Sequence, residues 1–404
     1  MSLAIVDARE WQNQFDLETG QKRQEDSPLV RMVSQVLRDN PYPGDVDERA
    51  NAWVSKTALD LIDGYQPDLV CLSYVQQFFA NRYFAHSKEE QDQLNRAAMA
   101  EANRFIEISG YTPVIVGTGG MTPLIGDIDL SGLDGLAISS NWSARYCGIH
   151  SPSQQDLAFL RSIEQIEVIV SRKEWIQLFR SEQPDIEIHQ DIHLMPDYLI
   201  AAKQGYAFKT MGTTLRKPVN LAENNFKIPV TTPLGQVADL RDIKQLIRSH
   251  LTTHKIALIL VEGLGQSYFP DHSFLCANGP GWFCNEPGDA FYLTLSTGKH
   301  QPFAYPTGYR YFDEDAENVK FPFSGYMNAI PQNTLALDYP GKSIAVGNRS
   351  MFMHLVFGAD IGIECFARNL FNQGCMGVIH TTAKYDPAPN GVSPKEKPSQ
   401  VKEA

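Results

Sequence analysis

Two loops hold the side chains whose types and spacing point to chemistry. The first follows an apolar run over residues 67–75 and carries Arg82 and His86. The second follows the run TPVIV and places Thr118 among three glycines. An imidazole can act as an acid, a base or a ligand, and a threonine hydroxyl can act as a nucleophile. The glycines of the second loop are Gly117, Gly119 and Gly120.

The glycine loop has two interpretations. Successive glycine N–H groups can form a nest for an anion, or the glycines can simply allow a tight turn. Arg82 would add positive charge to an anion site, and so would the cations near a later apolar strand. The sequence leaves both interpretations open. The later cations are Lys203, Lys209 and Arg216.

The segment between the two loops must position them. Residues 89–108 carry apolar side chains at helical spacing, and Gly110 stands where a left-handed C-terminal cap is expected. Two apolar strands joined by a helix predict a parallel pair, and parallel strands place ligands beyond their carboxyl ends. A third strand, ending at Ala202, leads to another loop. We predict that one sheet edge brings together Arg82, His86, Thr118, Gly119 and Thr213.

Apolar strands alternate with amphipathic helices throughout residues 1–225. This alternation predicts an α/β domain with a mostly parallel, doubly wound sheet and helices on both faces. The first strand ends at Asp7, and the next helix is predicted to run from a Ser27 cap through Asp39. A further helix is predicted to begin at residue 45 or 47 and to end at Gly64.

The chain changes character after a polar, turn-rich stretch at residues 220–233. Residues 226–380 are predicted to form a second α/β or α+β domain, with the strand IALILV at its centre. Residues 271–340 are dense in Gly, Pro, Tyr and Phe, so their aromatic side chains either line a pocket or cover a sheet. Residues 381–404 combine prolines with many charges and predict a disordered tail.

Composition narrows the classes of partner. The 404-residue chain is 43% hydrophobic and carries a net charge of −12, with a pI near 5.3. Nucleic acids and anionic membranes need a basic surface, so neither is expected as a partner. No run approaches the ~18 apolar residues of a membrane span. The six scattered cysteines predict reduced, buried thiols, and the start lacks a secretory signal, so a cytoplasmic protein is expected. A homo-oligomer is left open.

Two acidic or histidine-rich stretches raise the question of a metal. The carboxylates Asp127, Asp129 and Asp134 could bind a hard cation, but they lack the spacing of a calcium loop, and a solvated turn is favoured. Residues 187–193 would place two histidines and two acids on one strand face, as transition-metal sites do. An exposed polar strand face is favoured there. Those four residues are Glu187, His189, Asp191 and His193.

The order of elements over about residues 58–215 resembles the alkaline phosphatase-like superfamily, which includes nucleotide pyrophosphatases and phosphonoacetate hydrolases. In that family a P-D-L-V strand leads to a D-x-x-G-H-x-x-G loop, then to a helix and a strand ending in S-D-H-G-M. This chain has PDLVCLSYV, RYFAHSKE, a helix and VIVGTGGM in the same order. The resemblance implies a two-metal hydrolase in which Asp7 and His86 would be metal ligands.

Four residues of the family pattern are replaced. Arg82 replaces an aspartate, Thr118 and Gly119 replace the Asp-His pair, and Thr213 or Thr214 replaces the final histidine. Two zinc ions cannot be held by what remains, because each zinc needs at least three good protein ligands. Arg82 in place of a carboxylate changes the character of the site from metal-binding towards anion-binding. Whether a divalent metal such as zinc is a cofactor is therefore left open.

Two classes of function follow. The first is a hydrolase or transferase acting on a small phosphate, phosphonate or related anionic ester. His86 would be its acid–base catalyst or a metal ligand, and Thr118 or Thr213 would supply a candidate hydroxyl group. The second is a catalytically silent relative that binds an anion or nucleotide without metal. A flavodoxin-like or cobalamin-binding module is a third alternative, but the D-x-H-x-x-G signature of cobalamin binding is missing.

Overall fold

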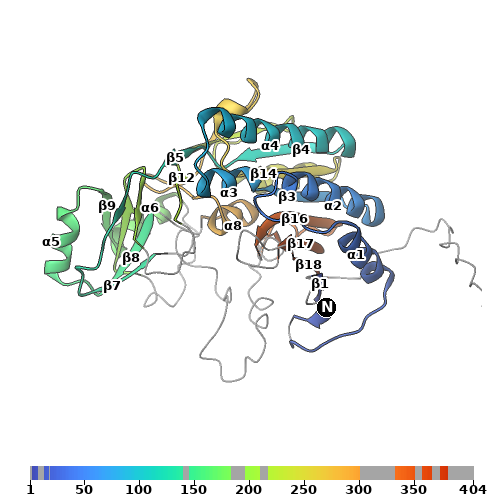
Figure 1. Ribbon diagram of the computed structural model, residues 1–404, viewed down its shortest axis with the longest axis horizontal. Coiled ribbons are helices and arrows are strands. Elements are labelled where there is room, and N and C mark those ends of the chain that lie inside the picture. The colour runs from blue at the N-terminus through green and yellow to red at the C-terminus, as the bar shows by residue number, and fades with distance from the viewer. Residues whose placement is uncertain are drawn as a thin grey trace, which may run out of the picture.

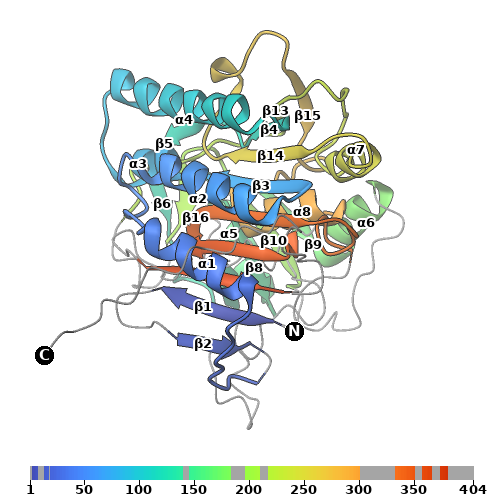
Figure 2. The same cartoon turned by 90° about the vertical axis from the view of Figure 1, so that its right-hand side faces the viewer.

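The computed structural model describes most of the chain, and Figures 1 and 2 show it from two sides. The described residues are 2–7, 13–17, 19–139, 145–182, 196–209, 217–300, 333–350, 357–365 and 374–380. The predicted tail, residues 381–404, lies outside these ranges, and so do residues 301–332 of the aromatic-rich segment. So do Thr213, Thr214, Arg216 and residues 187–193.

A ten-stranded mixed sheet forms the body of the protein. In order across the sheet, its strands are β15 (Phe274–Ala277), β13 (Lys227–Thr231), β4 (Thr112–Gly117), β14 (Ile256–Val261), β3 (Leu69–Tyr74), β16 (Ser343–Ser350), β17 (Ile361–Cys365), β18 (Cys375–Ile379), β1 (Leu3–Asp7) and β2 (Asn13–Asp16). The five strands from β4 to β17 are parallel to one another. All other pairings in this sheet are antiparallel.

The α/β class is confirmed, whereas a mostly parallel sheet is not, because antiparallel strands flank the parallel centre. One cause is the short link between β17 and β18. Only residues 366–374 join these two strands, and a parallel crossover needs a dozen residues or more. β18 therefore returns beside β17 in the opposite direction, and their paired residues run from Ile361 and Ile379 to Cys365 and Cys375.

The strand IALILV, β14, lies between β3 and β4. Ile256 pairs with Leu69 on one side and with Thr112 on the other. β3 and β4 are therefore parallel, as predicted, but they are not neighbours. β14 does not centre a separate sheet, so the boundary expected near residue 225 falls within one sheet. All three strands are apolar, and such composition does not reveal which strands are adjacent.

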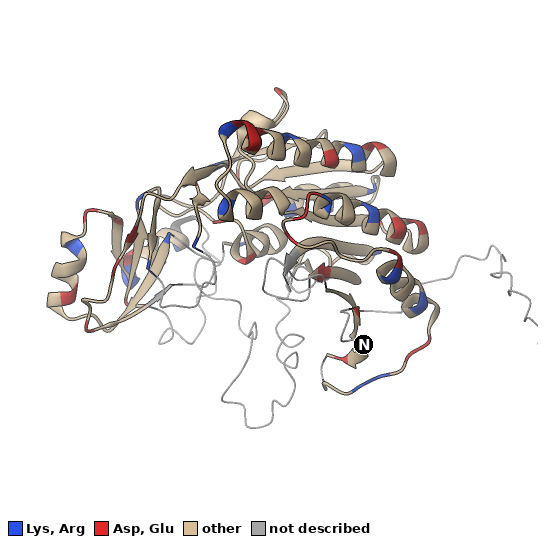
Figure 3. Cartoon of the chain, in the orientation of Figure 1, with Lys and Arg blue, Asp and Glu red and all other residues tan. Residues whose placement is uncertain are grey.

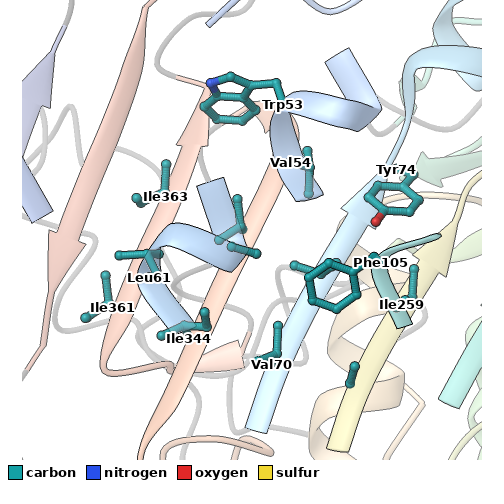
Figure 4. Packing of buried hydrophobic residues seen from close by; sticks show 14 of the residues in the cluster. Trp53, Val54, Leu61, Val70, Tyr74, Phe105, Ile259, Ile344, Ile361 and Ile363 are labelled. Atoms are coloured by element: carbon teal, nitrogen blue, oxygen red, sulfur yellow. The ribbon is translucent and has the colours of Figure 1, made fainter. Parts of the chain in front are cut away.

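Helices cover both faces of the sheet. α1 (Pro28–Asp39), α2 (Ala50–Tyr65) and α4 (Lys88–Ser109) pack on one face, and α7 (Asp242–His250) and α8 (Asp289–Thr297) pack on the other. Each face of the sheet has its own hydrophobic core, and alternate residues of β3 point into one or the other. Val70 and Leu72 lie under α2 and α4, whereas Leu69 and Cys71 face α7 and α8. Figure 4 shows the first core, where Trp53 and Leu61 of α2 lie over β16 and β17.

Helix ends follow the sequence closely. Ser27 caps α1 by accepting a hydrogen bond from the Val30 N–H, and α1 ends at Asp39, as predicted. α4 has a capping box and ends at Gly110, whose φ of 70° confirms the predicted left-handed cap. The start of α2 was predicted too early, because residues 45–49 form turns before the helix begins at Ala50.

A smaller lobe is inserted between β4 and β13. Its four-stranded antiparallel sheet has the order β7 (Leu136–Ser139), β8 (Tyr146–His150), β10 (Tyr198–Ala202) and β9 (Ile166–Ser171), and its helices are α5 (Gln154–Ser162) and α6 (Arg172–Glu182). Figure 1 shows this lobe in green, to one side of the main sheet. The prediction that β10 joins β3 and β4 in one parallel sheet is therefore wrong.

Two short ladders connect the lobe to the body. β5 (Met121–Pro123) pairs with β12 (Asn220–Ala222), so the chain enters and leaves the lobe along one antiparallel ribbon. β6 (Gly126–Ile128) pairs with β11 (Tyr206–Phe208) further out. Because the ribbon starts directly after the glycine loop, the lobe is connected to the main sheet at its carboxyl edge.

Acidic and basic residues are mixed along the outer helices (Figure 3). Among the described helices, none is long and apolar enough to cross a membrane. The six cysteines are all free and buried, as predicted.

Candidate functional site

Three connections meet at the carboxyl edge of the parallel strands. β3 leads directly into α3 (Gln76–Tyr83), β4 leads into residues 118–120, and β14 leads into a turn that reaches η2 (Gln266–Tyr268). The Val219 N–H donates to the Arg82 carbonyl, so the ribbon from the lobe also packs against α3. The structure thus places Arg82, Thr118 and the glycine loop in the connections at this edge, and that they form one functional site stays a prediction.

Thr118 has a structural partner at this edge. Its side chain is fully buried, and its Oγ1 accepts a hydrogen bond of 2.9 Å from the Gly263 N–H. The N–H of Gly119 donates to the Leu264 carbonyl at 3.0 Å. These two bonds join the loop after β4 to the loop after β14. This geometry favours a turn-forming role for Thr118 over a role as nucleophile.

The glycines of this loop are explained by close packing. A Cβ on Gly117 would lie 2.5 Å from the Leu264 carbonyl oxygen, and Gly119 has a φ of +92°, which side chains rarely adopt. A Cβ on Gly120 would lie 2.8 Å from a carboxylate oxygen of Glu223. Because the Gly119 N–H is already bonded and a carboxylate borders Gly120, the tight-turn interpretation is favoured over the anion nest.

Arg82 lies in the last turn of α3, and His86 lies in the link between α3 and α4. The Arg82 guanidinium lies 5.8 Å from the Phe78 ring centre and 5.7 Å from that of Tyr83, within range of cation–π attraction. Among the described residues, no carboxylate lies within 4.0 Å of it. His86 stands just before α4, with Nδ1 3.9 Å from Glu90. Its buried Nε2 has no hydrogen-bond partner within the described structure.

The two predicted metal ligands do not come together. Asp7 ends β1, which is separated from β3 by β16, β17 and β18. Four strand spacings of ~4.8 Å put the two strands ~19 Å apart, and His86 lies beyond β3, beside α4. The described ranges contain no group of three His, Cys, Asp or Glu side chains that could hold a metal. Asp7 and His86 therefore do not fit a shared metal ion.

The acidic loop after the glycines is also neutralised without a metal. Asp127 pairs with Lys217 at 2.6 Å, and Asp129 pairs with Lys209 at 2.8 Å. Lys209 is one of the cations that were considered for an anion site. Its pairing with Asp129 favours the prediction of a solvated turn.

A chain of buried polar side chains, which we call the relay, was not predicted. Glu262 follows β14, Ser73 lies near the end of β3, and Tyr292 projects from α8. The Tyr292 hydroxyl donates to Oε1 of Glu262 and is hydrogen-bonded to the Ser73 Oγ. Since Tyr292 has one proton to donate, Ser73 is the donor in the second bond. Ser73 and Glu262 are fully buried, and Tyr292 is 1% exposed.

Three amide side chains surround the backbone beside the relay. Gln77 donates to the Glu262 carbonyl at 2.6 Å and to the Tyr74 carbonyl at 2.9 Å. Asn51 donates to Gln77 Oε1, and Asn348 donates to Asn51 Oδ1. These amides join α2, α3 and β16 and hold fixed the strand ends from which Ser73 and Glu262 project.

One signal could have revealed the relay. Glu262 is a lone acid directly after six apolar residues and before a glycine, which is where a parallel strand presents functional groups. It was assigned to a separate unit, so it was not considered together with the loops after β3 and β4. Ser73 is one polar residue within an apolar strand, and Tyr292 lies in an aromatic-rich segment. Neither stands out in the sequence.

The fold and site define an α/β protein whose polar groups gather at the carboxyl edge of a mixed sheet. No protein-family model, no curated protein and no solved structure matches the chain. The resemblance of residues 58–215 to the alkaline phosphatase-like superfamily therefore stays a prediction.

Proposed function

We propose that this protein is a hydrolase or transferase acting on a small ester at the carboxyl edge of β3 and β14. The observation that carries the proposal is the relay of Ser73, Tyr292 and Glu262. A hydroxyl is a weak nucleophile until a base removes its proton, and a hydrogen-bonded carboxylate can supply that base through an intervening hydroxyl. In the relay, Ser73 would be the nucleophile, Tyr292 the intervening hydroxyl and Glu262 the base.

In the proposed reaction, the Ser73 oxygen attacks the electrophilic atom of the ester. The Ser73 proton moves to the Tyr292 oxygen while the Tyr292 proton moves to Glu262. The bond to the leaving alcohol breaks, and that alcohol takes the proton back through the same relay. Water or a second alcohol then attacks the covalent intermediate and gives its proton to the relay, the bond to the Ser73 oxygen breaks, and that oxygen takes the proton back. Attack by water gives hydrolysis and attack by an alcohol gives transfer.

The proposed substrate class is a small phosphate, phosphonate or related anionic ester. The sequence resemblance favours this class, and Arg82 at the same edge is a cation without a carboxylate partner in the described chain. Asp7 and His86 do not fit one metal ion, so no step is assigned to a metal. Ser73 is fully buried, so the substrate must displace the chain that covers it.

A second candidate is a silent protein that binds a small anion or nucleotide at this edge. The burial of Ser73 and the stacked guanidinium of Arg82 favour it. In that case the relay would only hold α8 against β3 and β14. The two candidates differ in whether Ser73 reacts.

The deciding experiment treats the native protein with an alkyl fluorophosphonate, which transfers its phosphonyl group to an activated serine and releases fluoride. Peptide mapping by mass spectrometry should find the label on Ser73, and aryl phosphate or phosphonate hydrolysis should fall at least ~10³-fold in Ser73→Ala. Ser296→Ala is the matched control. Ser296 is a buried serine, and its hydroxyl donates to the Leu293 carbonyl of its own helix.

Label on Ser73 that disappears in Tyr292→Phe would support the relay. An unlabelled native protein that hydrolyses none of these esters would exclude the enzyme and leave the binding candidate. Labelling of another serine with unchanged turnover in Ser73→Ala would place the chemistry elsewhere.

A further inference from the structure

Two cysteines face each other across neighbouring strands. Cys365 ends β17, Cys375 begins β18, and the two are direct partners in the antiparallel ladder. Directly opposed residues in such a ladder have Cα atoms about 4.5 or 5.5 Å apart, depending on the hydrogen-bonding pattern. Disulfides form over Cα separations of about 4.4–6.8 Å. The register therefore meets the distance requirement in either pattern.

The two side chains also point the same way. Opposed residues in a ladder share a face, and both thiols belong to the apolar core under α1 and α2. Cys365 is 0% exposed and Cys375 is 1% exposed. Val33 and Leu37 of α1 pack on neighbouring Gly377, so α1 covers this part of the sheet.

The other strand cysteines have different partners. Cys71 lies opposite Leu258 and Ala345, Cys147 lies opposite Ile200 and Ser139, and Cys276 lies opposite Ile228. Within the described strands, Cys365 and Cys375 form the one cysteine pair in register.

We propose that Cys365 and Cys375 are a redox modification site that forms a reversible intramolecular disulfide. Two thiols lose two protons and two electrons as the S–S bond forms. A hydroperoxide accepts them and becomes an alcohol and water, or a small-molecule disulfide accepts them and becomes two thiols. Thiol–disulfide exchange with a dithiol reverses the reaction.

Burial makes the reaction slow without preventing it. Desolvation raises the pKa of both thiols, so little thiolate is present at neutral pH. The oxidant must reach the pair through local opening of the structure, which proteins undergo under native conditions. Oxidation should therefore be slower than at an exposed thiol and should depend on the opening of this part of the sheet.

The pair lies next to the amide groups at the carboxyl edge. Cys365 is within hydrogen-bonding distance of Tyr42 and Asp45, which also bond to each other. The Tyr42 hydroxyl approaches the Asn348 carbonyl at 3.4 Å. A disulfide would withdraw the Cys365 sulfur from Tyr42 and Asp45, so the oxidised form should differ at the Asn348 end of that network.

The experiment incubates the folded, reduced protein with hydrogen peroxide or with oxidised glutathione. The protein is then quenched in acid, denatured and alkylated with a maleimide. The titratable thiols should fall from six to four. Peptide mapping should find one linked pair, Cys365–Cys375, and dithiothreitol should restore all six thiols.

Two variants make the result specific. Cys365→Ser should keep its five remaining thiols, whereas the control Cys276→Ser should fall from five to three. If Cys365→Ser does not fold, the peptide map of the native protein still shows which two cysteines are linked. Six thiols remaining in the native protein, or a linkage that joins any other pair, would overturn the proposal.

Discussion

The two edges of the parallel strands use buried carboxylates differently. At the amino edge, Asp360 accepts bonds from the Ser343 N–H at 2.9 Å and from the Tyr65 hydroxyl at 3.2 Å. Asp68, which is partly buried, likewise accepts from the Lys342 N–H at 3.1 Å. These carboxylates hold backbone groups in register. At the carboxyl edge, by contrast, Glu262 accepts from a side-chain hydroxyl that is bonded to a second hydroxyl.

The difference shows how a parallel sheet divides its tasks. Loops at the amino edge begin strands, so polar groups there act on the backbone that must be aligned. Loops at the carboxyl edge leave the strands and begin helices, so side chains there are available to a ligand. A buried acid is costly at either edge unless its hydrogen bonds are made. Asp360 accepts directly from two hydroxyls, those of Tyr65 and Ser343, whereas in the relay the Tyr292 hydroxyl lies between Glu262 and the Ser73 hydroxyl.

The sharpest test of this comparison replaces each acid by its amide. Glu262→Gln keeps an acceptor for Tyr292 but cannot take up a proton, so ester turnover should fall by ~10²–10⁴-fold. Asp360→Asn should lower the free energy of unfolding by about 1.5 kcal/mol, because its hydrogen bonds lose their charge assistance, and turnover should be unchanged. Steady-state kinetics and urea unfolding measure the two effects.

The comparison would break if the two variants behaved alike. If both variants lost stability and neither lost turnover, the relay would have only a structural role, like Asp360. Asp127→Ala is a control for the cost of removing any acid. Its ion pair with Lys217 is partly exposed, and such pairs contribute about 1 kcal/mol or less.

The pH dependence of stability has a separate source. His300 is 1% exposed, and burial lowers its pKa to about 4, despite a carboxylate of Asp239 3.9 Å away. The unfolded chain binds a proton near pH 6.5 that the folded chain accepts only near pH 4. Stability should therefore be complete above pH 6.5 and should fall by up to about 3 kcal/mol as the pH drops to 4.

Urea unfolding at several pH values measures this slope. His300→Gln should remove it, whereas His254→Gln, at an exposed position, should leave it intact. A slope that persists in His300→Gln would assign the acid sensitivity to other groups. Because His300 lies outside the relay, the stability profile and the pH profile of turnover should not coincide.

The last prediction concerns Arg82 and the anionic substrate class. Arg82→Ala should weaken binding of inorganic phosphate by about 1.5–3 kcal/mol, the contribution of a hydrogen bond to a charged group. Isothermal titration calorimetry measures it, with Arg96→Ala on α4 as control. Equal affinity in the native and Arg82→Ala proteins, or no phosphate binding by the native protein, would remove the anion site from the carboxyl edge.

Much of the local structure was predictable from the sequence because its causes are local. The Ser27 cap, the apolar spacing of residues 89–108 and the left-handed Gly110 each depend on residues within a few positions of one another. The same holds for the strands at residues 67–75 and 112–117, which were correctly predicted as parallel. That a functional site lies at the carboxyl edge of these strands stays a prediction.

The tertiary structure decided which strands are neighbours. It thereby also decided which residues form the candidate site. β14 enters the sheet between β3 and β4 after an insertion of more than a hundred residues, and it carries Glu262 to the end of β3. Nothing in an apolar strand specifies its partner, because such strands are interchangeable in composition and burial. Ser73, Tyr292 and Glu262 are separated by up to 219 positions in the chain, and only the packing of α8 on the sheet makes them one group.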